Sequence, residues 1–89
     1  ENVFPAEVEN LLVEHPAVAD AAVIGVPDDE FGQRLKAFLV LRLGQSLDAD
    51  TVRAHVKANL ARHKVPRDVE FVADLPRNAT GKLLRGELS

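Results

Sequence analysis

The stretch Leu35-Lys36-Ala37-Phe38-Leu39-Val40-Leu41-Arg42-Leu43 decides the fold, because its side chains follow the period of a β-strand. Every second residue from Leu35 onward is Leu or Ala, and the charged residues stand near the two ends. Successive side chains of a strand point to opposite faces of a sheet, so this period of two places an apolar row on one face. The stretch therefore predicts a strand with at least one face in a hydrophobic core.

Two further strands are expected along the chain. Residues 18–26 are rich in Val, Ala and Ile, which predicts a strand buried on both faces. The turn residues Pro27-Asp28-Asp29-Glu30 separate it from residues 35–43, so we expect these two strands to pair antiparallel. Residues 68–73 alternate again and predict a third strand. Its pairing partner, the first or the second strand, is left open by the sequence.

Helical periodicity marks two other segments. Pro5 suits a first helical turn, and the apolar residues after it recur at spacings of three and four until His15-Pro16 ends the segment. A second helix is predicted over residues 48–62, acidic at its start and basic at its end, as the helix dipole favours. Residues 83–88 predict a final helical turn. The fold class is therefore expected to be α+β: a small three-stranded sheet backed by helices, in the order helix–strand–strand–helix–strand, with a C-terminal lysine-bearing turn.

Composition narrows the class of protein. The chain has 89 residues, a net charge of −3 and no Cys, so it predicts one small domain without disulfides or thiolate metal sites. It is neither basic nor aromatic enough for a nucleic-acid partner, and no apolar run is long enough for a transmembrane segment. No secretory leader opens it, so we expect a cytoplasmic protein. The abrupt start at Glu1 suggests a piece of a longer protein.

The segment Leu75-Pro76-Arg77-Asn78-Ala79-Thr80-Gly81-Lys82 is predicted to form a turn that presents one lysine. Pro76 fixes the backbone, Asn78 and Gly81 tolerate left-handed angles, and Lys82 follows a residue with no side chain. An ammonium group in this position suits phosphate or carboxylate oxygens. A phosphate-binding P-loop is excluded, because Leu83 follows Lys82 where that motif needs Ser or Thr. On residue types alone, a solvated turn lysine remains the alternative.

Four segments carry a resemblance to a known family, and they span nearly the whole chain. The segments are residues 1–9 (ENVFPAEVE), 26–33 (VPDDEFGQ), 63–67 (HKVPR) and 75–82 (LPRNATGK). Their order and spacing resemble the C-terminal domain of the adenylate-forming enzyme superfamily, and most closely its acyl-CoA synthetases, the fatty-acid and aryl-CoA ligases.

The resemblance implies a two-step ligase reaction, AMP-forming, with ATP and CoA as substrates. A carboxylic acid and ATP give an acyl-adenylate and pyrophosphate, and the CoA thiol then displaces AMP. Residues 1–89 would be the mobile C-terminal lid domain, working with its own N-terminal domain, which is absent from this chain and would bind ATP and the acid. Lys82 is the implied catalytic residue of adenylation. Mg²⁺ is expected in the full-length enzyme but not in this domain, and the isolated chain is expected to be inactive.

The same resemblance implies part of a CoA site, made by Phe31 and the segment from His63 to Arg67. Phe31 would stack on the adenine, while Lys64 and Arg67 would meet the 3′-phosphate or the pyrophosphate, with His63 beside them. A hydrophobic rim residue and an ordinary basic helix end remain the alternative for these residues.

Two other functions stay open at this point. The chain would also suit an adenylation domain that loads a carrier protein, although such domains usually show a different opening segment. It would also suit a non-catalytic binding module with the same small fold. The sequence does not identify the acid that is activated, since the acyl pocket is expected in the absent N-terminal domain.

Overall fold

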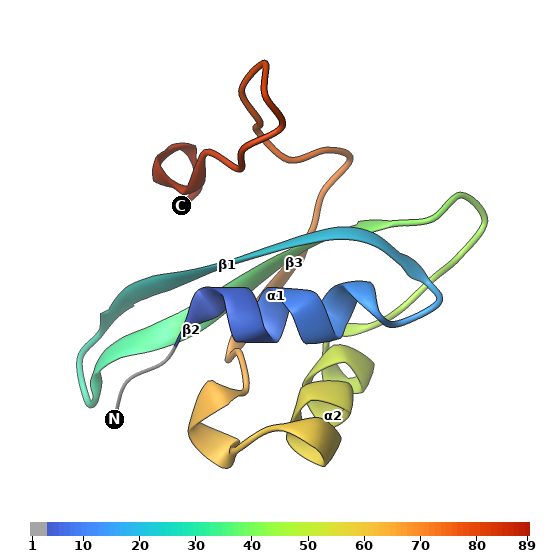
Figure 1. Cartoon of the computed structure of the whole chain (residues 1–89). Helices are drawn as coiled ribbons and strands as arrows, with labels where there is room; N and C mark the ends of the chain where they lie inside the picture. Colours follow the sequence, from blue (N-terminus) through green and yellow to red (C-terminus); the bar gives the residue numbers. More distant parts are fainter. Residues whose placement is uncertain (1–3) are drawn as a thin grey trace.

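The strand that contains most of the alternating stretch is the middle strand of a three-stranded sheet (Figure 1). The structure is a computed structural model, and it describes residues 4–89. The elements along the chain are α1 (Pro5–Val13), β1 (Val18–Asp28), β2 (Gly32–Leu41), α2 (Ala49–Asn59), the 3₁₀ turn η1 (Arg62–Lys64), β3 (Asp68–Phe71) and the 3₁₀ turn η2 (Arg85–Glu87). This order confirms the predicted α+β class and the predicted succession of helices and strands.

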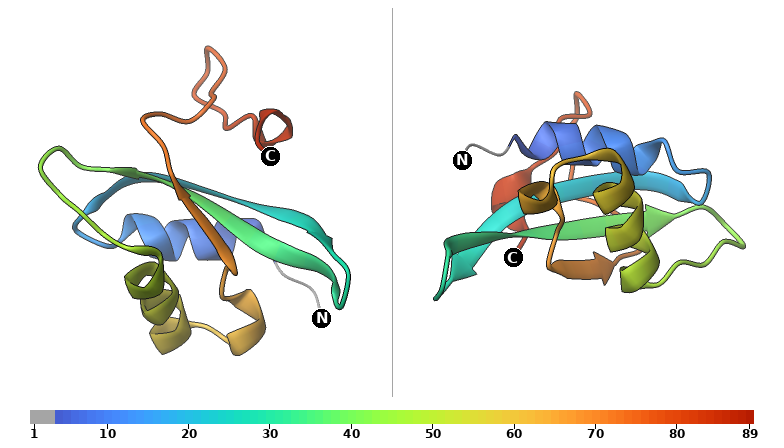
Figure 2. Two further views of the ribbon diagram at one scale, coloured as in Figure 1. Left: turned by 180° about the vertical axis from the view of Figure 1, so that it is seen from behind. Right: turned by 90° about the horizontal axis from the view of Figure 1, so that it is seen from below.

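The strand order in the sheet is β1-β2-β3. β1 and β2 pair antiparallel, as predicted, with a register that runs from Val18 opposite Leu41 to Asp28 opposite Gly32. β3 pairs with β2 in parallel, which settles the question that the sequence left open. A parallel neighbour cannot follow through a tight hairpin, so the chain needs a crossover between the two strands. The segment with α2 and η1 supplies that crossover (Figure 2).

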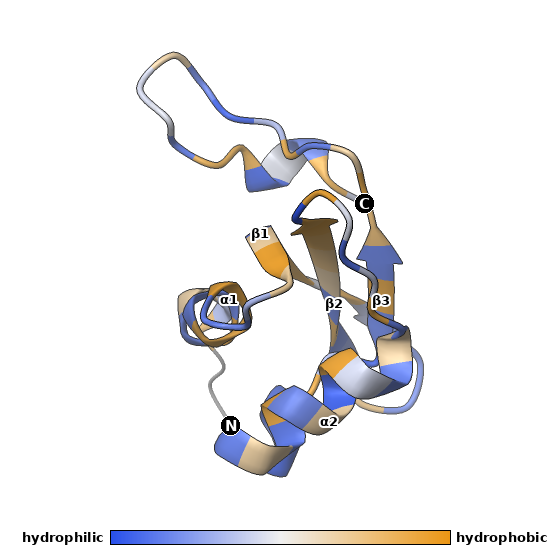
Figure 3. Cartoon of the chain, turned by 90° about the vertical axis from the view of Figure 1, so that its right-hand side faces the viewer, coloured by the Kyte–Doolittle hydropathy of each residue, from blue (hydrophilic) through white to orange (hydrophobic). Residues whose placement is uncertain are grey.

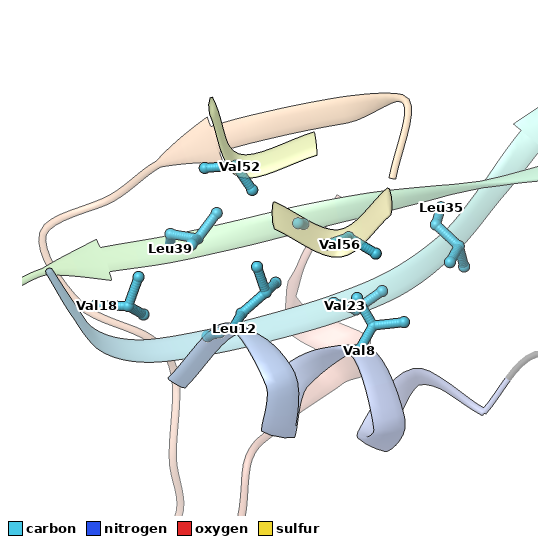
Figure 4. Close-up of a cluster of buried hydrophobic side chains, with 10 residues drawn as sticks. Val8, Leu12, Val18, Val23, Leu35, Leu39, Val52 and Val56 are labelled. Atoms are coloured by element: carbon cyan, nitrogen blue, oxygen red, sulfur yellow. The ribbon is translucent and has the colours of Figure 1, made fainter. Parts of the chain in front are cut away.

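The sheet has a buried apolar core on each of its two faces. The helix-side core packs β1 and β2 against α1 and α2 (Figure 4), and its buried members are Val8, Leu12, Val18, Ala21, Val23, Leu35, Ala37, Leu39, Val52 and Val56. The C-terminal-side core is smaller, and its buried members are Ala22, Phe38 and Leu75. Because neighbouring residues of a strand face opposite ways, β1 contributes to both cores, as its composition predicted.

The C-terminal segment covers the face of the sheet that the helices leave bare. Leu75 is buried against Ala22 and Phe38, and Leu83 and Leu88 pack onto the same cluster. In Figure 3 this segment and α2 lie on opposite sides of the strands. The lysine-bearing turn and the final helical turn are thus attached to the sheet by the apolar residues that flank them.

The second helix is shorter than predicted at its C-terminal end. It begins after Asp48, whose carboxylate accepts a hydrogen bond of 2.7 Å from the Thr51 N–H as a helix cap. It was predicted to reach Arg62 but ends at Asn59, because Leu60 takes an extended backbone (φ −131°, ψ 169°). The basic residues after it form the separate turn η1. No helix in residues 4–89 has the length and apolar character to cross a lipid bilayer.

Two predicted strand ends are also wrong. The strand predicted to reach Leu43 ends at Leu41, and Leu43 is fully exposed (102%) beside Gly44, whose φ of +79° turns the chain. The strand predicted to reach Ala73 ends at Phe71. Alternation continues past the strand in both cases, so periodicity alone does not locate where pairing stops.

We expect Leu39→Ala to destabilise the domain strongly, because Leu39 is completely buried in the helix-side core. Loss of a buried Leu side chain leaves a cavity and typically costs about 2–5 kcal/mol in the free energy of unfolding. Leu43→Ala is the matched control and should change it by less than about 0.5 kcal/mol. Urea denaturation of the 89-residue chain measures both values. Equal effects of the two substitutions would contradict the described burial.

Candidate functional site

Lys82 lies near the tip of a short β-hairpin formed by residues 77–83. Arg77 and Leu83 make an antiparallel bridge, and the Asn78 N–H donates to the Lys82 carbonyl oxygen at 3.0 Å. Below them, the Leu84 N–H donates to the Pro76 carbonyl oxygen at 2.9 Å. The predicted turn is therefore a closed hairpin whose base continues into the apolar residues that pack on the sheet.

The side chain of Asn78 organises this hairpin from inside. Its Oδ1 accepts hydrogen bonds from the Thr80 N–H (3.0 Å), the Thr80 hydroxyl (2.8 Å) and the Lys82 N–H (2.9 Å). Gly81 takes a φ of +86°, which only glycine adopts without strain. Asn78, Thr80 and Gly81 thus fix the backbone that carries Lys82. Gly81 takes the left-handed angle expected of it, whereas Asn78 keeps a negative φ and acts through its side chain.

The Lys82 side chain is exposed, and its ammonium group has no hydrogen bond or ion pair with any residue of the described range 4–89. All the hydrogen bonds that Lys82 makes in this range come from its backbone. The hairpin therefore exposes a cation that is available to bind a ligand or another domain.

Arg77 fastens the hairpin to the sheet. Its Nε and Nη2 donate to both carboxylate oxygens of Asp20 in β1, at 2.8–3.2 Å, and its Nη1 donates to the Gly81 carbonyl oxygen at 2.8 Å. The hydrogen-bonded charge of Asp20 raises the pKa of Arg77, so the guanidinium stays protonated. Sequence reasoning placed Arg77 in a matched segment but gave no role to Asp20, which lies 57 residues away in the chain.

A buried carboxylate makes a second attachment. Glu9 in α1 is only 9% exposed, and its Oε2 accepts a 2.7 Å hydrogen bond from the Val23 N–H of β1. Arg85 in η2 forks onto the same carboxylate through Nε (3.0 Å) and Nη2. Glu9 therefore accepts a hydrogen bond from an N–H group of the edge strand β1. Arg85 neutralises the buried negative charge of Glu9. Sequence reasoning missed this link, although Glu9 belongs to the matched opening segment.

Three of the predicted CoA-site residues line one hollow on the helix side of the sheet. The hollow is lined by Phe31, Gln33, Arg34, Leu35, Lys57, Arg62, His63, Val65 and Arg67. It thus brings together Phe31, His63 and Arg67, with Phe31 68% exposed at its rim. Lys64 does not line it, because its Nζ forms an ion pair with Glu7 Oε1 of α1 at 2.6 Å.

Sequence reasoning missed other cations of this hollow. Arg62 and Lys57 have no ion-pair partner within residues 4–89. Arg34 is bound at Nε to Asp68 Oδ2 (3.0 Å). The cationic lining arises because α2, η1 and β2 converge here, and spacing in the chain gives no signal of that convergence.

Asp28 organises the β1–β2 turn that carries Phe31. Its Oδ2 accepts hydrogen bonds from the Phe31 N–H (2.8 Å) and the Glu30 N–H (3.3 Å), and its Oδ1 lies 3.5 Å from Arg34 Nη1 and 3.7 Å from Arg67 Nη1. The hydrogen bond from Phe31 and the charges of Arg67 and Arg34 hold the pKa of Asp28 below its usual value, against the opposing effect of burial. The carboxylate thus couples the turn to the cationic lining of the hollow.

The Lys82 hairpin and the hollow lie on opposite sides of the sheet. Figure 1 shows the hairpin above the strands, with α2 and η1 below them, and the left view of Figure 2 shows the same arrangement from behind. The two sets of predicted site residues are therefore separate surfaces of one small domain. Of the matched opening segment, Glu1, Asn2 and Val3 lie outside the described residues. Within residues 4–89, no three His, Asp or Glu side chains gather as metal ligands.

Comparison with known proteins points to one family, both by sequence and by fold. The family model described as the AMP-binding enzyme C-terminal domain matches residues 7–82. The 2-succinylbenzoate–CoA ligase of Geobacillus kaustophilus is 50% identical over 88 residues, which cover 99% of this chain and 18% of that ligase. The fatty acid–[acyl-carrier-protein] ligase ScoC of Streptomyces coeruleorubidus is 44% identical over 88 residues, covering 99% of this chain and 17% of that protein.

The fold is also that of solved acyl-CoA synthetases. The crystal structure of the Brucella canis acyl-CoA synthetase superposes with a TM-score of 0.94 at 41% sequence identity, covering 99% of this chain and 17% of that one. The family match and the shared α+β fold thus define a small C-terminal domain of the AMP-binding enzyme class. The chain belongs to the AMP-binding enzyme C-terminal domain family. It spans less than a fifth of the length of these relatives.

We expect the stability of the domain to fall in acid partly through Asp28. Its pKa is lower in the folded state than in the unfolded chain. The stabilisation is therefore complete above the unfolded-state value of about 4 and is lost as pH falls through the lower folded-state value. Between pH 6 and pH 3, Asp28→Asn should consequently lose less free energy of unfolding than the wild type.

Urea denaturation at both pH values measures this difference. Asp29→Asn, in the same turn, is the matched control and should keep the wild-type pH dependence, since within residues 4–89 its carboxylate accepts no hydrogen bond. Identical pH dependence of the Asp28→Asn variant and the wild type would count against the role of this carboxylate.

Proposed function

We propose that the chain is the mobile C-terminal domain of an AMP-forming carboxylic acid–CoA ligase. It supplies Lys82 to adenylation and part of the CoA site to thioester formation. ATP and the acid are bound by an N-terminal domain of the full-length enzyme, and Mg²⁺ accompanies ATP there. The observation that carries this proposal is the uncommitted ammonium of Lys82 on a hairpin fixed at its base, in a chain that belongs to this family.

The chemistry of adenylation calls for a cation in this position. A carboxylate oxygen of the acid forms a bond to the α-phosphorus of ATP, and pyrophosphate leaves. Two anions must approach each other for this step. A preorganised ammonium between them offsets their repulsion and the charge that develops in the transition state. Lys82 suits this role because the hairpin backbone is fixed while the side chain is free to reach a ligand.

The second step places different demands on the domain. The CoA sulfur attacks the acyl carbon of the adenylate, and AMP leaves. CoA carries an adenine and several phosphate groups, which suit an exposed aromatic ring beside cations. Phe31, His63 and Arg67 line a hollow of this character, and Arg62 and Lys57 add positive charge to it. We assign CoA to this hollow, while Lys64 remains engaged with Glu7.

The opposite placement of the two surfaces supports a domain that rotates between the steps. The hairpin of residues 77–83 lies on the other side of the sheet from α2 and η1, which contribute to the hollow. One fixed orientation therefore cannot turn both surfaces toward a single adenylate. Rotation of the small domain as a unit brings first the hairpin and then the hollow to the N-terminal domain.

A ligase that loads an acyl-carrier protein is the second candidate. The similarity to ScoC favours it, because that relative is named for a carrier-protein acceptor. Lys82 would keep the same role, and the hollow would meet a carrier-bound phosphopantetheine in place of CoA. Product analysis with CoA and with a carrier protein as alternative acceptors separates the two.

We expect Lys82→Ala in the full-length enzyme to lower the rate of adenylation by about 10²–10³-fold. Thioester formation from supplied acyl-adenylate should stay close to the wild-type rate, since the lysine faces away from that step. Pyrophosphate release and acyl-CoA formation, measured separately, give the two rates. An equal loss in both steps, or none in the first, would overturn the role of Lys82.

We expect Phe31→Ala to raise the KM for CoA by about tenfold, because base stacking on an aromatic ring contributes about 1–3 kcal/mol. The adenylation rate should not change. Phe71→Ala is the matched control, since Phe71 is also exposed (38%) but does not line the hollow. Steady-state kinetics with varied CoA measures the effect, and an unchanged KM would leave Phe31 as a surface residue of the turn.

A further inference from the structure

One guanidinium joins the Lys82 hairpin to the sheet, and its partner on the sheet is an acid outside the four short segments quoted for the family resemblance. Arg77 contacts both carboxylate oxygens of Asp20 and the carbonyl oxygen of Gly81, the residue before Lys82. We propose that Asp20, acting through Arg77, is a positioning residue for Lys82. This inference rests on the role proposed for Lys82 in adenylation.

The geometry of the contact suits positioning. A guanidinium is a planar fork, so bonds at Nε and Nη2 to one carboxylate fix its orientation as well as its place. The remaining Nη1 then points at the Gly81 carbonyl in a fixed direction (2.8 Å). Asp20 thus determines where Arg77 holds the backbone one residue before Lys82. A lysine at position 77 would keep the charge but lose the fork.

We expect the pair to contribute less to folding than the apolar cores do. The side chains of Arg77 and Asp20 are 38% and 28% exposed, and ion pairs in contact with solvent add little to stability. The base of the hairpin is held independently by Leu75 and Leu83 in the C-terminal-side core, and η2 is held by Arg85 on Glu9. Removing Asp20 should therefore leave the domain folded and release only the upper part of the hairpin.

A small displacement of that part matters for catalysis. The catalytic atom of Lys82 lies at the end of a flexible stem, so the hairpin backbone sets the volume that it can reach. A misplacement of about 1 Å can cost a reaction about 10²-fold in rate. The loss should appear in kcat of adenylation and not in binding, because the lysine acts on charge that develops in the transition state.

The test uses the full-length enzyme with Asp20→Asn and, as a second variant, Arg77→Lys. Both should lower kcat of adenylation by about 10–100-fold, with KM for ATP and thioester formation from supplied acyl-adenylate unchanged. Asp20→Glu, which restores a carboxylate, should recover part of the rate. Glu70→Gln is the matched control: it removes a strand carboxylate paired with Lys36 at 3.0 Å, and it should leave adenylation at the wild-type rate.

A double-mutant cycle with Lys82→Ala shows whether Asp20 acts through the lysine. In the Lys82→Ala background, Asp20→Asn should cause no further loss, because groups that act as a unit are not additive. Independent, multiplicative losses would overturn the inference, as would wild-type kcat in Asp20→Asn, or a fall in the thermal unfolding midpoint that parallels the loss of rate in both variants. If Lys82→Ala itself leaves adenylation intact, the proposed function fails instead.

Discussion

The fold depends on one constraint: the middle strand β2 has two apolar faces, and a sheet of three strands must bury both. The helices cover one face, where Leu39 and its neighbours meet α1 and α2. Only the C-terminal segment remains for the other, and Leu75 fills it against Ala22 and Phe38. The need to bury Phe38 therefore brings the end of the chain onto the sheet, and with it the hairpin that carries Lys82 (Figure 3).

This arrangement places two chemistries on opposite sides of the same sheet. The C-terminal side bears the ammonium of Lys82, unpaired within residues 4–89, on a hairpin that Arg77 braces, which suits one reacting centre. The helix side bears a broad hollow with several cations and an exposed ring, which suits a large phosphorylated ligand. Asp20–Arg77 links the hairpin to β1, and Glu9–Arg85 links η2 to α1. A rigid domain with two such surfaces is what a two-step ligase needs if each step uses a different one.

Local sequence predicted the elements well, because alternation in residues 35–41 and helical spacing after Pro5 express burial directly. Part of the turn at Lys82 was also predictable, since Gly81 takes the left-handed angle that a residue without a side chain allows. Asn78 acts through its side chain instead, by accepting from the Thr80 and Lys82 N–H groups. The parallel pairing of β3, the Glu9–Arg85 link across 76 residues and the cations that α2 brings to the hollow were not predictable. These arise from the way the chain folds back on itself, which short-range periodicity does not encode.

The most direct test is a crystal structure of the full-length enzyme with ATP and a non-reactive analogue of its acid. We expect the Lys82 ammonium within hydrogen-bond distance of the α-phosphate or the acid, the Arg77–Asp20 contact intact, and the hollow of Phe31, His63 and Arg67 turned away from the nucleotide. A structure in which that hollow holds the ATP while Lys82 points into solvent would contradict the assignment of the two surfaces.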